Sequence, residues 1–216
     1  MMPMERLTLH VTFLSPWHCG AGHGGGSNVD AAVVRDDLGL PYVPGRTLKG
    51  VLRHALDRVE SWGHLKNLTG PASATQRLFG SRHGDFGRRT LPGCLAIDNA
   101  RLPEAELSWL SGVDRQKRVD ITGQMIKVMQ STAIAEATGT ARAKTLRSME
   151  VAIPMTLQAE VTYCLPADPG WAVELKDGIA DPAPHWKSCL DAALPLVTAI
   201  GANRTRGYGR VRLSWG

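Results

Sequence analysis

Glycine and arginine are concentrated in the segment from Ile200 to Arg210, near the end of the sequence. Three glycines and three arginines stand among its eleven residues. Glycine accepts positive φ values and lets a backbone approach a ligand closely, and the planar guanidinium group matches the oxygen atoms of a phosphate. The segment is therefore predicted to be a loop that holds a polyanion through Asn203, Arg204, Arg206, Gly207 and Gly209. The alternative interpretation is a basic turn between a helix and a strand.

A second candidate anion site lies at the beginning of a predicted helix over Thr47–Glu60. Free N–H groups at the start of a helix, together with nearby basic side chains, favour anion binding. The basic residues in question are Arg46, Lys49 and Arg53. The helix itself is predicted from an apolar stripe at helical spacing, made of Leu48, Val51, Leu52, Ala55, Leu56 and Val59. The alternative is that the basic residues are only the solvated flank of this helix.

Two histidines and an aspartate lie in or beside the glycine-rich stretch Cys19–Asn28. His18 and His23 could act as acid and base in RNA cleavage, because imidazole titrates near neutral pH. A solvated histidine in a loop more often has no such role. Taken by itself, Asp30 is interpreted as a turn or capping residue beside the glycine loop.

The composition indicates a folded globular protein with a modest excess of positive charge. The chain has 216 residues and a formal net charge of +5, and hydrophobic residues make up 43% of it. The charge permits nucleic-acid binding without requiring it. No apolar run reaches the length of a membrane span, and no signal-peptide pattern precedes the first predicted strand. Four cysteines without CxxC spacing argue against a zinc site and fit a reducing, cytoplasmic location.

The elements that must position these side chains follow from hydrophobic periodicity. Leu7, Leu9, Val11 and Phe13 alternate with polar residues, a pattern typical of a half-buried strand. Pro154 is expected to mark an edge or bulge in a long strand, and Pro195 to kink the last helix. The remaining predictions are strands over Ala31–Arg35, Cys94–Asp98, Val151–Tyr163 and Val211–Trp215, and helices over Ala72–Leu78 and Trp186–Ile200.

The order of these elements predicts an α+β fold. It corresponds to a ferredoxin-like (RRM-like) βαββαβ core, in which an antiparallel sheet carries helices on one face. The region Asp114–Arg147 interrupts the pattern, because its periodicity is weak and its charge is dense. We expect residues 110–150 to form an irregular, thumb-like arm inserted into a single domain over residues 1–216.

Four segments, in this order, resemble motifs of the RAMP superfamily of CRISPR proteins. Pro41–Arg53 is similar to the family's proline-glycine helix start, and Phe79-Gly80 with the strand ending at Asp98 to its next segment. Gly201–Gly209 resembles the C-terminal glycine-rich loop. Thr138–Val151 resembles the thumb of the backbone (repeat) subunit of type III effector complexes of the Csm and Cmr kinds.

The resemblance implies a crRNA-binding backbone subunit. Copies of such a subunit stack along the guide with other effector subunits and grip its phosphates, and the thumb displaces a base of the guide–target duplex. Sequence choice is then left to base pairing. Partners implied are crRNA, target RNA, further copies and other effector subunits, with no membrane. The implied RNA contacts are Arg46, Lys49, Arg53, Lys144, Arg147, Asn203, Arg204, Arg206, Gly207 and Gly209.

The resemblance also assigns chemistry to Asp30, which matches the position of an aspartate that supports cleavage of target RNA. A 2′-hydroxyl of the displaced nucleotide would attack its own phosphate, and Asp30 would hold Mg²⁺ or another divalent metal, or lie near the attacking oxygen. Two alternatives remain open. One is an inert structural RNA-binding subunit of the same kind of complex, and the other is an endoribonuclease that processes guide RNA through histidine.

Overall fold

The computed structural model describes residues 5–22, 29–65, 73–81, 90, 92–165 and 185–216. Its centre is a four-stranded antiparallel sheet in the order β2-β5-β1-β6. The strands are β1 (Glu5–Phe13), β2 (Leu95–Ile97), β5 (Thr156–Tyr163) and β6 (Val211–Trp215). This order, with a helix before β2 and another before β6, is that of a ferredoxin-like βαββαβ core. The predicted α+β fold class is confirmed.

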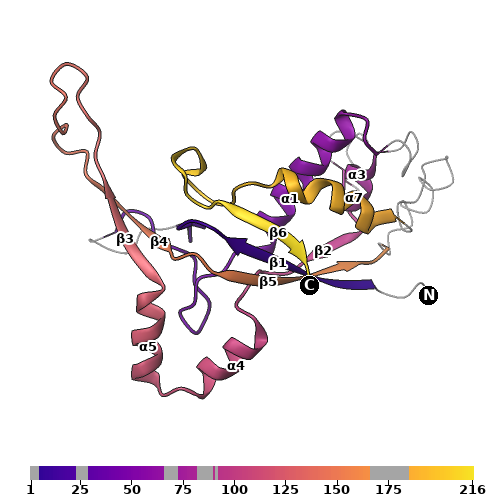
Figure 1. Ribbon diagram of the computed structural model, residues 1–216, viewed down its shortest axis with the longest axis horizontal. Coiled ribbons are helices and arrows are strands. Elements are labelled where there is room, and N and C mark those ends of the chain that lie inside the picture. The colour runs from indigo at the N-terminus through magenta and orange to yellow at the C-terminus, as the bar shows by residue number, and fades with distance from the viewer. Residues whose placement is uncertain (1–4, 23–28, 66–72, 82–89, 91, 166–184) are drawn as a thin grey trace.

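One face of the sheet is apolar and the other is polar. Leu9 and Val11 of β1 are fully buried, while Thr8, which precedes Leu9, is exposed and His10 between them is partly exposed. The register pairs Leu9 with Ala159 of β5 and with Trp215 of β6, so inward-facing residues of adjacent strands lie side by side. The sheet therefore has one face to bury, and helices α1 (Gly45–Ser61), α3 (Ala74–Phe79) and α7 (Trp186–Ala193) lie over that face (Figure 1).

Helix α1 supplies the largest part of the helical layer. Leu48, Leu52 and Leu56 recur every four residues and are fully buried against the sheet. The predicted helix over Thr47–Glu60 is thus confirmed, and it begins two residues earlier and ends one residue later than predicted. Gly45 is also buried, since the first turn of α1 lies directly on the backbone of β2 at Ile97. Its N–H group donates to Oδ1 of Asn99 at 2.8 Å.

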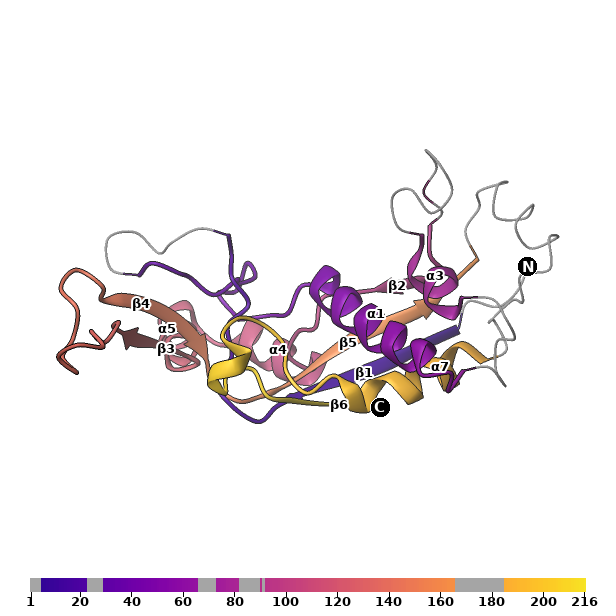
Figure 2. The ribbon, with the colours of Figure 1, turned by 90° about the horizontal axis from the view of Figure 1, so that it is seen from above.

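The arm is more regular than the sequence suggested. After β2 the chain forms α4 (Glu104–Gly112) and α5 (Arg115–Gln124), and then the hairpin of β3 (Ile126–Ser131) and β4 (Arg147–Ala152). Figures 1 and 2 show this hairpin extending away from the sheet, with α4 and α5 on the side opposite α1. The expectation of irregular structure was wrong. Most residues of α4 and α5 are exposed, so these helices carry almost no apolar stripe, and hydrophobic periodicity could not reveal them.

Three boundaries also differ from the predictions. The segment Ala31–Arg35 forms only isolated bridges to other segments and no regular strand. The long strand expected over Val151–Tyr163 is divided around Pro154 into β4 of the arm and β5 of the sheet. Helix α7 ends at Ala193 and a 3₁₀ turn, η2 (Leu194–Leu196), follows. Proline at position 195 cannot continue the hydrogen bonds of an α-helix, so it ends this helix instead of kinking it.

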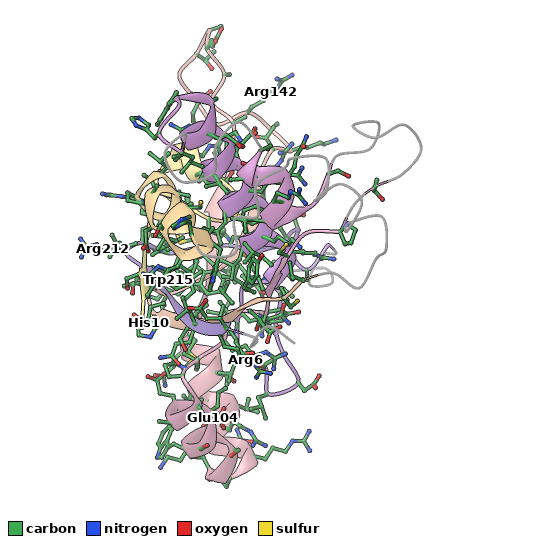
Figure 3. The ribbon with its side chains drawn as sticks, turned by 90° about the vertical axis from the view of Figure 1, so that its right-hand side faces the viewer. Arg6, His10, Glu104, Arg142, Arg212 and Trp215 are labelled. Carbon is green, nitrogen blue, oxygen red and sulfur yellow. The ribbon has the colours of Figure 1, made fainter. Side chains whose placement is uncertain are left out.

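The polar face of the sheet and the hairpin of the arm lie in different parts of the molecule. Figure 3 places Arg142 in the arm hairpin and Glu104 in α4 at opposite ends of the view, with Arg6 and His10 of β1 between them. Within the described part of the chain, no helix combines the length and the apolar character needed to cross a membrane.

The packing of α1 on β2 predicts opposite effects for two glycines of one helix. A Cβ atom at position 45 would collide with the carbonyl oxygen of Ile97, whereas one at position 50 would enter open space. We expect Gly45→Ala to lower the free energy of unfolding by about 2 kcal/mol. The control Gly50→Ala should raise it by up to about 1 kcal/mol. Urea unfolding followed by circular dichroism measures both, and equal stabilities for the two variants would contradict the described packing.

Candidate functional site

The glycine-rich loop lies tightly against the chain that leaves β1. Gly201 has a φ of +99° and Gly209 a φ of +66°, values that L side chains rarely adopt. A Cβ atom at position 201 would collide with the carbonyl oxygen of His18, and one at position 209 with that of Ile200. The N–H of Gly209 donates to the oxygen of Pro16 at 2.8 Å. These two glycines are therefore needed for the close approach of backbone to backbone.

The middle of the loop is exposed and positively charged. Residues Arg204–Arg206 form a single 3₁₀ turn, η3, between Asn203 and Gly207, which both have left-handed backbone conformations. The side chains of Arg204 and Arg206 are exposed and make no ion pair with the described residues. The tight ends of the loop thus hold two arginines with their charges available to a ligand.

A cavity of about 310 Å³ joins this loop to the beginning of α1. Arg46 and Thr47 line one side of it, and Gly201, Ala202 and Arg204 line the other. Figure 2 shows the loop that carries η3 beyond the first turn of α1, on the side of the molecule toward the arm hairpin. The two anion sites predicted separately from the sequence are therefore parts of one surface.

The lining of this cavity contains no acidic residue. It includes His18, Cys19 and Gly20. Burial raises the pKa of the Cys19 thiol to about 12, so the thiol remains protonated at neutral pH and contributes no charge. The charge of Arg46 and Arg204 is consequently not compensated within the cavity, which favours an anionic ligand.

Two predicted RNA contacts on α1 lie elsewhere. Nζ of Lys49 donates to the carbonyl oxygen of Leu95 at 2.9 Å, so this side chain is held against β2. Burial, and then the charge of Arg53, lower the pKa of Lys49. Neither Lys49 nor Arg53 lines the cavity that contains Arg46. Their role in RNA binding stays a prediction that the geometry does not support.

Asp30 lies at the root of the arm, where the segment after the first loop contacts β4. Its Oδ2 accepts a hydrogen bond from the N–H of Ser148 at 2.7 Å, and its own N–H donates to the oxygen of Ser148 at 3.0 Å. The residue is exposed. No group of three or more potential metal ligands occurs among the residues that the structure describes. Asp30 therefore offers a metal ion one carboxylate, which suffices only if waters and phosphate oxygens complete the shell.

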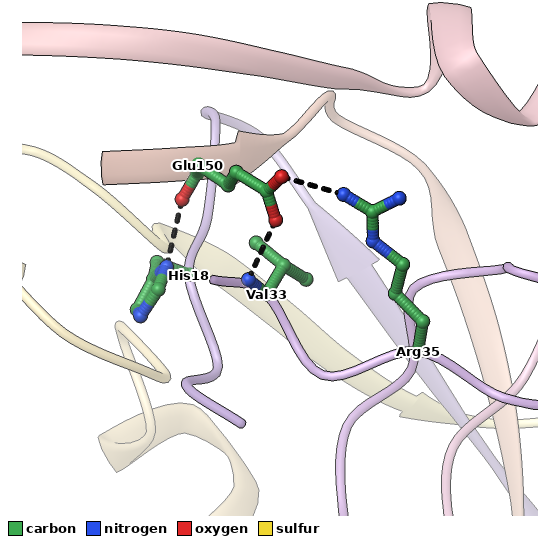
Figure 4. A network of polar contacts seen from close by, with 4 residues as sticks. All are labelled: His18, Val33, Arg35 and Glu150. Carbon is green, nitrogen blue, oxygen red and sulfur yellow. Dashed lines mark hydrogen bonds and ion pairs between the residues drawn. The ribbon is translucent and has the colours of Figure 1, made fainter. Parts of the chain in front are cut away.

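Glu150 of β4 was not identified from the sequence, yet it links three segments (Figure 4). Its Oε1 accepts from Arg35 at 2.7 Å and its Oε2 from the N–H of Val33 at 3.0 Å. Its carbonyl oxygen is 2.7 Å from Nδ1 of His18. These partners lie more than a hundred positions away, so no local pattern could have revealed the network.

The network gives His18 a structural position. Its side chain is 5% exposed, and its Nδ1 is engaged by Glu150. His23, the other histidine considered as an acid or base, lies outside the described residues.

The arm presents its basic residues to solvent. Arg142, Lys144 and Arg147 are all exposed, and Lys144 has a φ of +59° in the hairpin connection. Large apolar side chains of the arm are exposed as well, namely Val128, Met129, Ile134 and Leu146. Asn203 reaches this region, since its Nδ2 is 3.4 Å from Sδ of Met149 in β4. The glycine-rich loop thus touches the base of the arm.

Comparison with solved structures supports the fold assignment. One similar chain belongs to the cryo-EM structure of the Type III-B Cmr-beta bound to cognate target RNA. It has a TM-score of 0.62 and 11% identity, with 98% of this chain and 97% of that chain covered. A second belongs to the Type III-B Cmr-beta in the apo state, with a TM-score of 0.63, 12% identity, and 97% and 96% covered. At these identities the likeness establishes the fold.

Comparison of the sequence alone gives two further results. No curated protein sequence matches the chain significantly. The model of the RAMP superfamily matches residues 10–212, which include the end of β1, all of α1, the arm and the glycine-rich loop. A match over nearly the whole length shows the family, and it agrees with the order of the sheet and with the place of the loop. The protein belongs to the RAMP superfamily.

Proposed function

We propose that the protein is a crRNA-binding backbone subunit of a type III CRISPR effector complex. Membership of the RAMP superfamily and the fold shared with chains of Type III-B Cmr-beta structures support this assignment. The observation that carries it is the cavity in which Arg46 of α1 faces Arg204 of the glycine-rich loop. Two guanidinium groups that form no ion pair with the described residues, beside closely packed backbone, offer a site for the phosphates of a single strand.

The chemistry of the cavity favours recognition of the nucleic-acid backbone over recognition of bases. Arg46 and Arg204 supply its guanidinium groups. The other lining residues include Gly20, Gly201 and Ala202, whose small size leaves the backbone accessible. Contacts of this kind fix the position of a strand without reading its sequence. That property suits a subunit that must accept any guide.

The exposed arm is proposed to contact target RNA and neighbouring subunits. Lys144 and Arg147 provide charge for phosphates, while Ile134 and Leu146 offer apolar surface to bases or to another copy. An exposed apolar surface on a projecting hairpin generally marks an interaction site. Further copies of the chain and other effector subunits are therefore the expected protein partners.

The first test of this function is loss of guide binding in arginine variants. Arg204→Ala and Arg206→Ala should each weaken binding of guide RNA by roughly tenfold, equally for unrelated guide sequences, because each removes a phosphate contact. The slope of log K against log salt should flatten by roughly 0.7 per lost contact. Fluorescence anisotropy of labelled RNA at several salt concentrations measures both effects.

A charge-matched control comes from the polar face of the sheet. Arg6 is exposed, its guanidinium group lies 3.4 Å from Glu160, and it is not among the residues that line the cavity. Arg6→Ala should leave guide binding nearly unchanged. If all three variants lose affinity by the same factor, net charge alone is responsible and the cavity is not the site. If wild-type protein fails to bind guide RNA at low salt, the proposed function is wrong.

Metal-dependent cleavage of target RNA is a second proposed activity, and the position of Asp30 favours it. The carboxylate is exposed at the root of the arm, and the backbone of Ser148 holds one of its oxygens in place. A bound divalent ion would supply charge stabilisation at the scissile phosphate. Asp30 would contribute one oxygen ligand, and the subunit would fix the strand so that a 2′-hydroxyl is in line with the adjacent phosphate.

Cleavage is tested by Asp30→Asn in the assembled complex. Asparagine keeps an oxygen acceptor for the N–H of Ser148 and removes the negative charge, so the local fold should persist. We expect cuts in target RNA to fall by at least a hundredfold, with assembly and guide binding retained. Asp37→Asn, in an exposed turn, is the control. A denaturing gel of labelled target RNA with and without Mg²⁺ shows the result.

Other outcomes of this experiment select other functions. Target RNA that stays whole with the intact complex in Mg²⁺ would identify an inert RNA-binding subunit. Cuts that persist in Asp30→Asn would place the chemistry elsewhere. Cleavage of precursor guide RNA by the isolated chain, lost in His23→Ala, would support the histidine-dependent endoribonuclease.

A further inference from the structure

Five residues spaced by four positions form a stripe along the outer side of α1. They are Arg46, Gly50, His54, Arg58 and Trp62, which follows the last turn, and we refer to them as the α1 stripe. All five are exposed, and the indole of Trp62 is 54% exposed. Residues four apart are neighbours on the surface of a helix, and a series of them winds gradually around it. Of these five residues, only Arg46 was predicted from the sequence to bind a ligand.

A groove runs along this stripe. A cavity of about 680 Å³ is lined by Gly50, His54 and Arg58 on α1 and by Thr198, Arg204 and Thr205 on the facing segment. It shares Val51 and Arg204 with the cavity at the beginning of α1, so the two cavities are adjacent. The absence of a side chain at Gly50 leaves space in this groove, because nothing lies within 4 Å of the position that a Cβ atom would take.

Trp62 follows the groove-lining residue Arg58 by one helical turn and lies outside the lining of the groove itself, among cationic and aromatic neighbours. The guanidinium carbon of Arg58 lies 5.1 Å from the centre of the Trp62 ring, and the ring of His64 meets that indole edge-on at 6.3 Å. An exposed tryptophan beside basic side chains is typical of proteins that stack the bases of single-stranded nucleic acids. The Arg58 contact holds the indole in place while leaving much of it accessible.

The dimensions and charge of the groove match a nucleic-acid strand. Four residues of an α-helix rise by about 6 Å, which is comparable to the step between successive phosphates in an extended strand. No acidic side chain lines either cavity among the described residues. An acidic peptide would satisfy the charges of Arg58 and Arg204, but it would make no use of the exposed indole face.

We propose that the guide strand continues from the glycine-rich loop along the α1 stripe and that Trp62 stacks on one of its bases. This inference rests on the proposed function, because the groove extends the cavity that binds the guide. It assigns to the helical face of the domain a binding site for several consecutive nucleotides. Arg58 and Arg204 bind phosphates, and Gly50 provides the space for the strand to pass.

Stacking by Trp62 is tested with guide RNA and the purified chain. Trp62→Ala should weaken binding by roughly tenfold, whereas Trp62→Phe should retain most of the affinity, because a benzene ring still stacks. Trp109→Ala, which removes an exposed indole from α4, is the control and should have no effect. Gly50→Leu should also weaken binding, because it fills the groove without altering charge. Fluorescence anisotropy at fixed salt measures all four variants.

The outcomes separate this inference from the proposed function. If Arg204→Ala weakens binding and Trp62→Ala does not, the guide still binds at the loop and the α1 stripe is no part of its path. If wild-type protein binds no guide RNA, both proposals fall. If Trp62→Ala leaves RNA affinity intact but releases another effector subunit from the complex, the groove holds protein and the inference is overturned.

Discussion

The candidate site depends on the packing of backbone against backbone where the chain leaves β1. Pro16 and His18 in this short segment accept hydrogen bonds from Gly209 and Ala202 of the glycine-rich loop. The ring of His18 then bonds to Glu150, which belongs to the arm. One stretch of chain therefore fixes the loop that carries the arginines and the strand from which the arm projects. Because the two backbones are in direct contact, neither the glycine-rich loop nor the segment after β1 can shift without the other.

This packing gives the arginines a fixed position even though they lie in a loop. A flexible loop with the charge of Arg204 and Arg206 would lose entropy on binding an anion, and that loss would reduce its affinity. The left-handed residues Gly201 and Gly209 at the two ends hold the loop before any ligand arrives. Helix α1 is equally fixed, since Leu48 and Leu52 are fully buried beneath it. The cationic groups are thus positioned by rigid elements on both sides.

Local patterns predicted the elements that bury an apolar face. The alternation in β1 and the apolar stripe of α1 arise because each element buries one face and exposes the other. Both elements were predicted to within a few residues. The arm shows the limit of this reasoning. Its helices are exposed on most sides, so their stability comes from local signals such as the side chain of Asp114, which caps α5. Hydrophobic periodicity does not contain that information.

The site itself was predictable in part. Glycine and arginine are conspicuous in sequence, and for that reason Arg46 and the loop residues were found. The joining of Arg46 to Arg204 in one cavity depends on the sheet order and could not be read from spacing. Lys49 illustrates the opposite case, since a basic residue in the right turn of α1 faces β2 instead of the cavity. The Glu150 network depends on contacts between distant segments and was therefore missed.

The two edge strands of the central sheet limit how another chain can pair with it. The outer strands are β2 and β6, which span only three and five residues. Such short edge strands give a second chain few free backbone groups to pair with, so strand addition is disfavoured. In the proposed effector complex, copies of this protein would then associate through side chains of loops, helices and the hairpin. Interfaces of that kind tolerate small changes of angle, which would suit subunits arranged along a guide RNA.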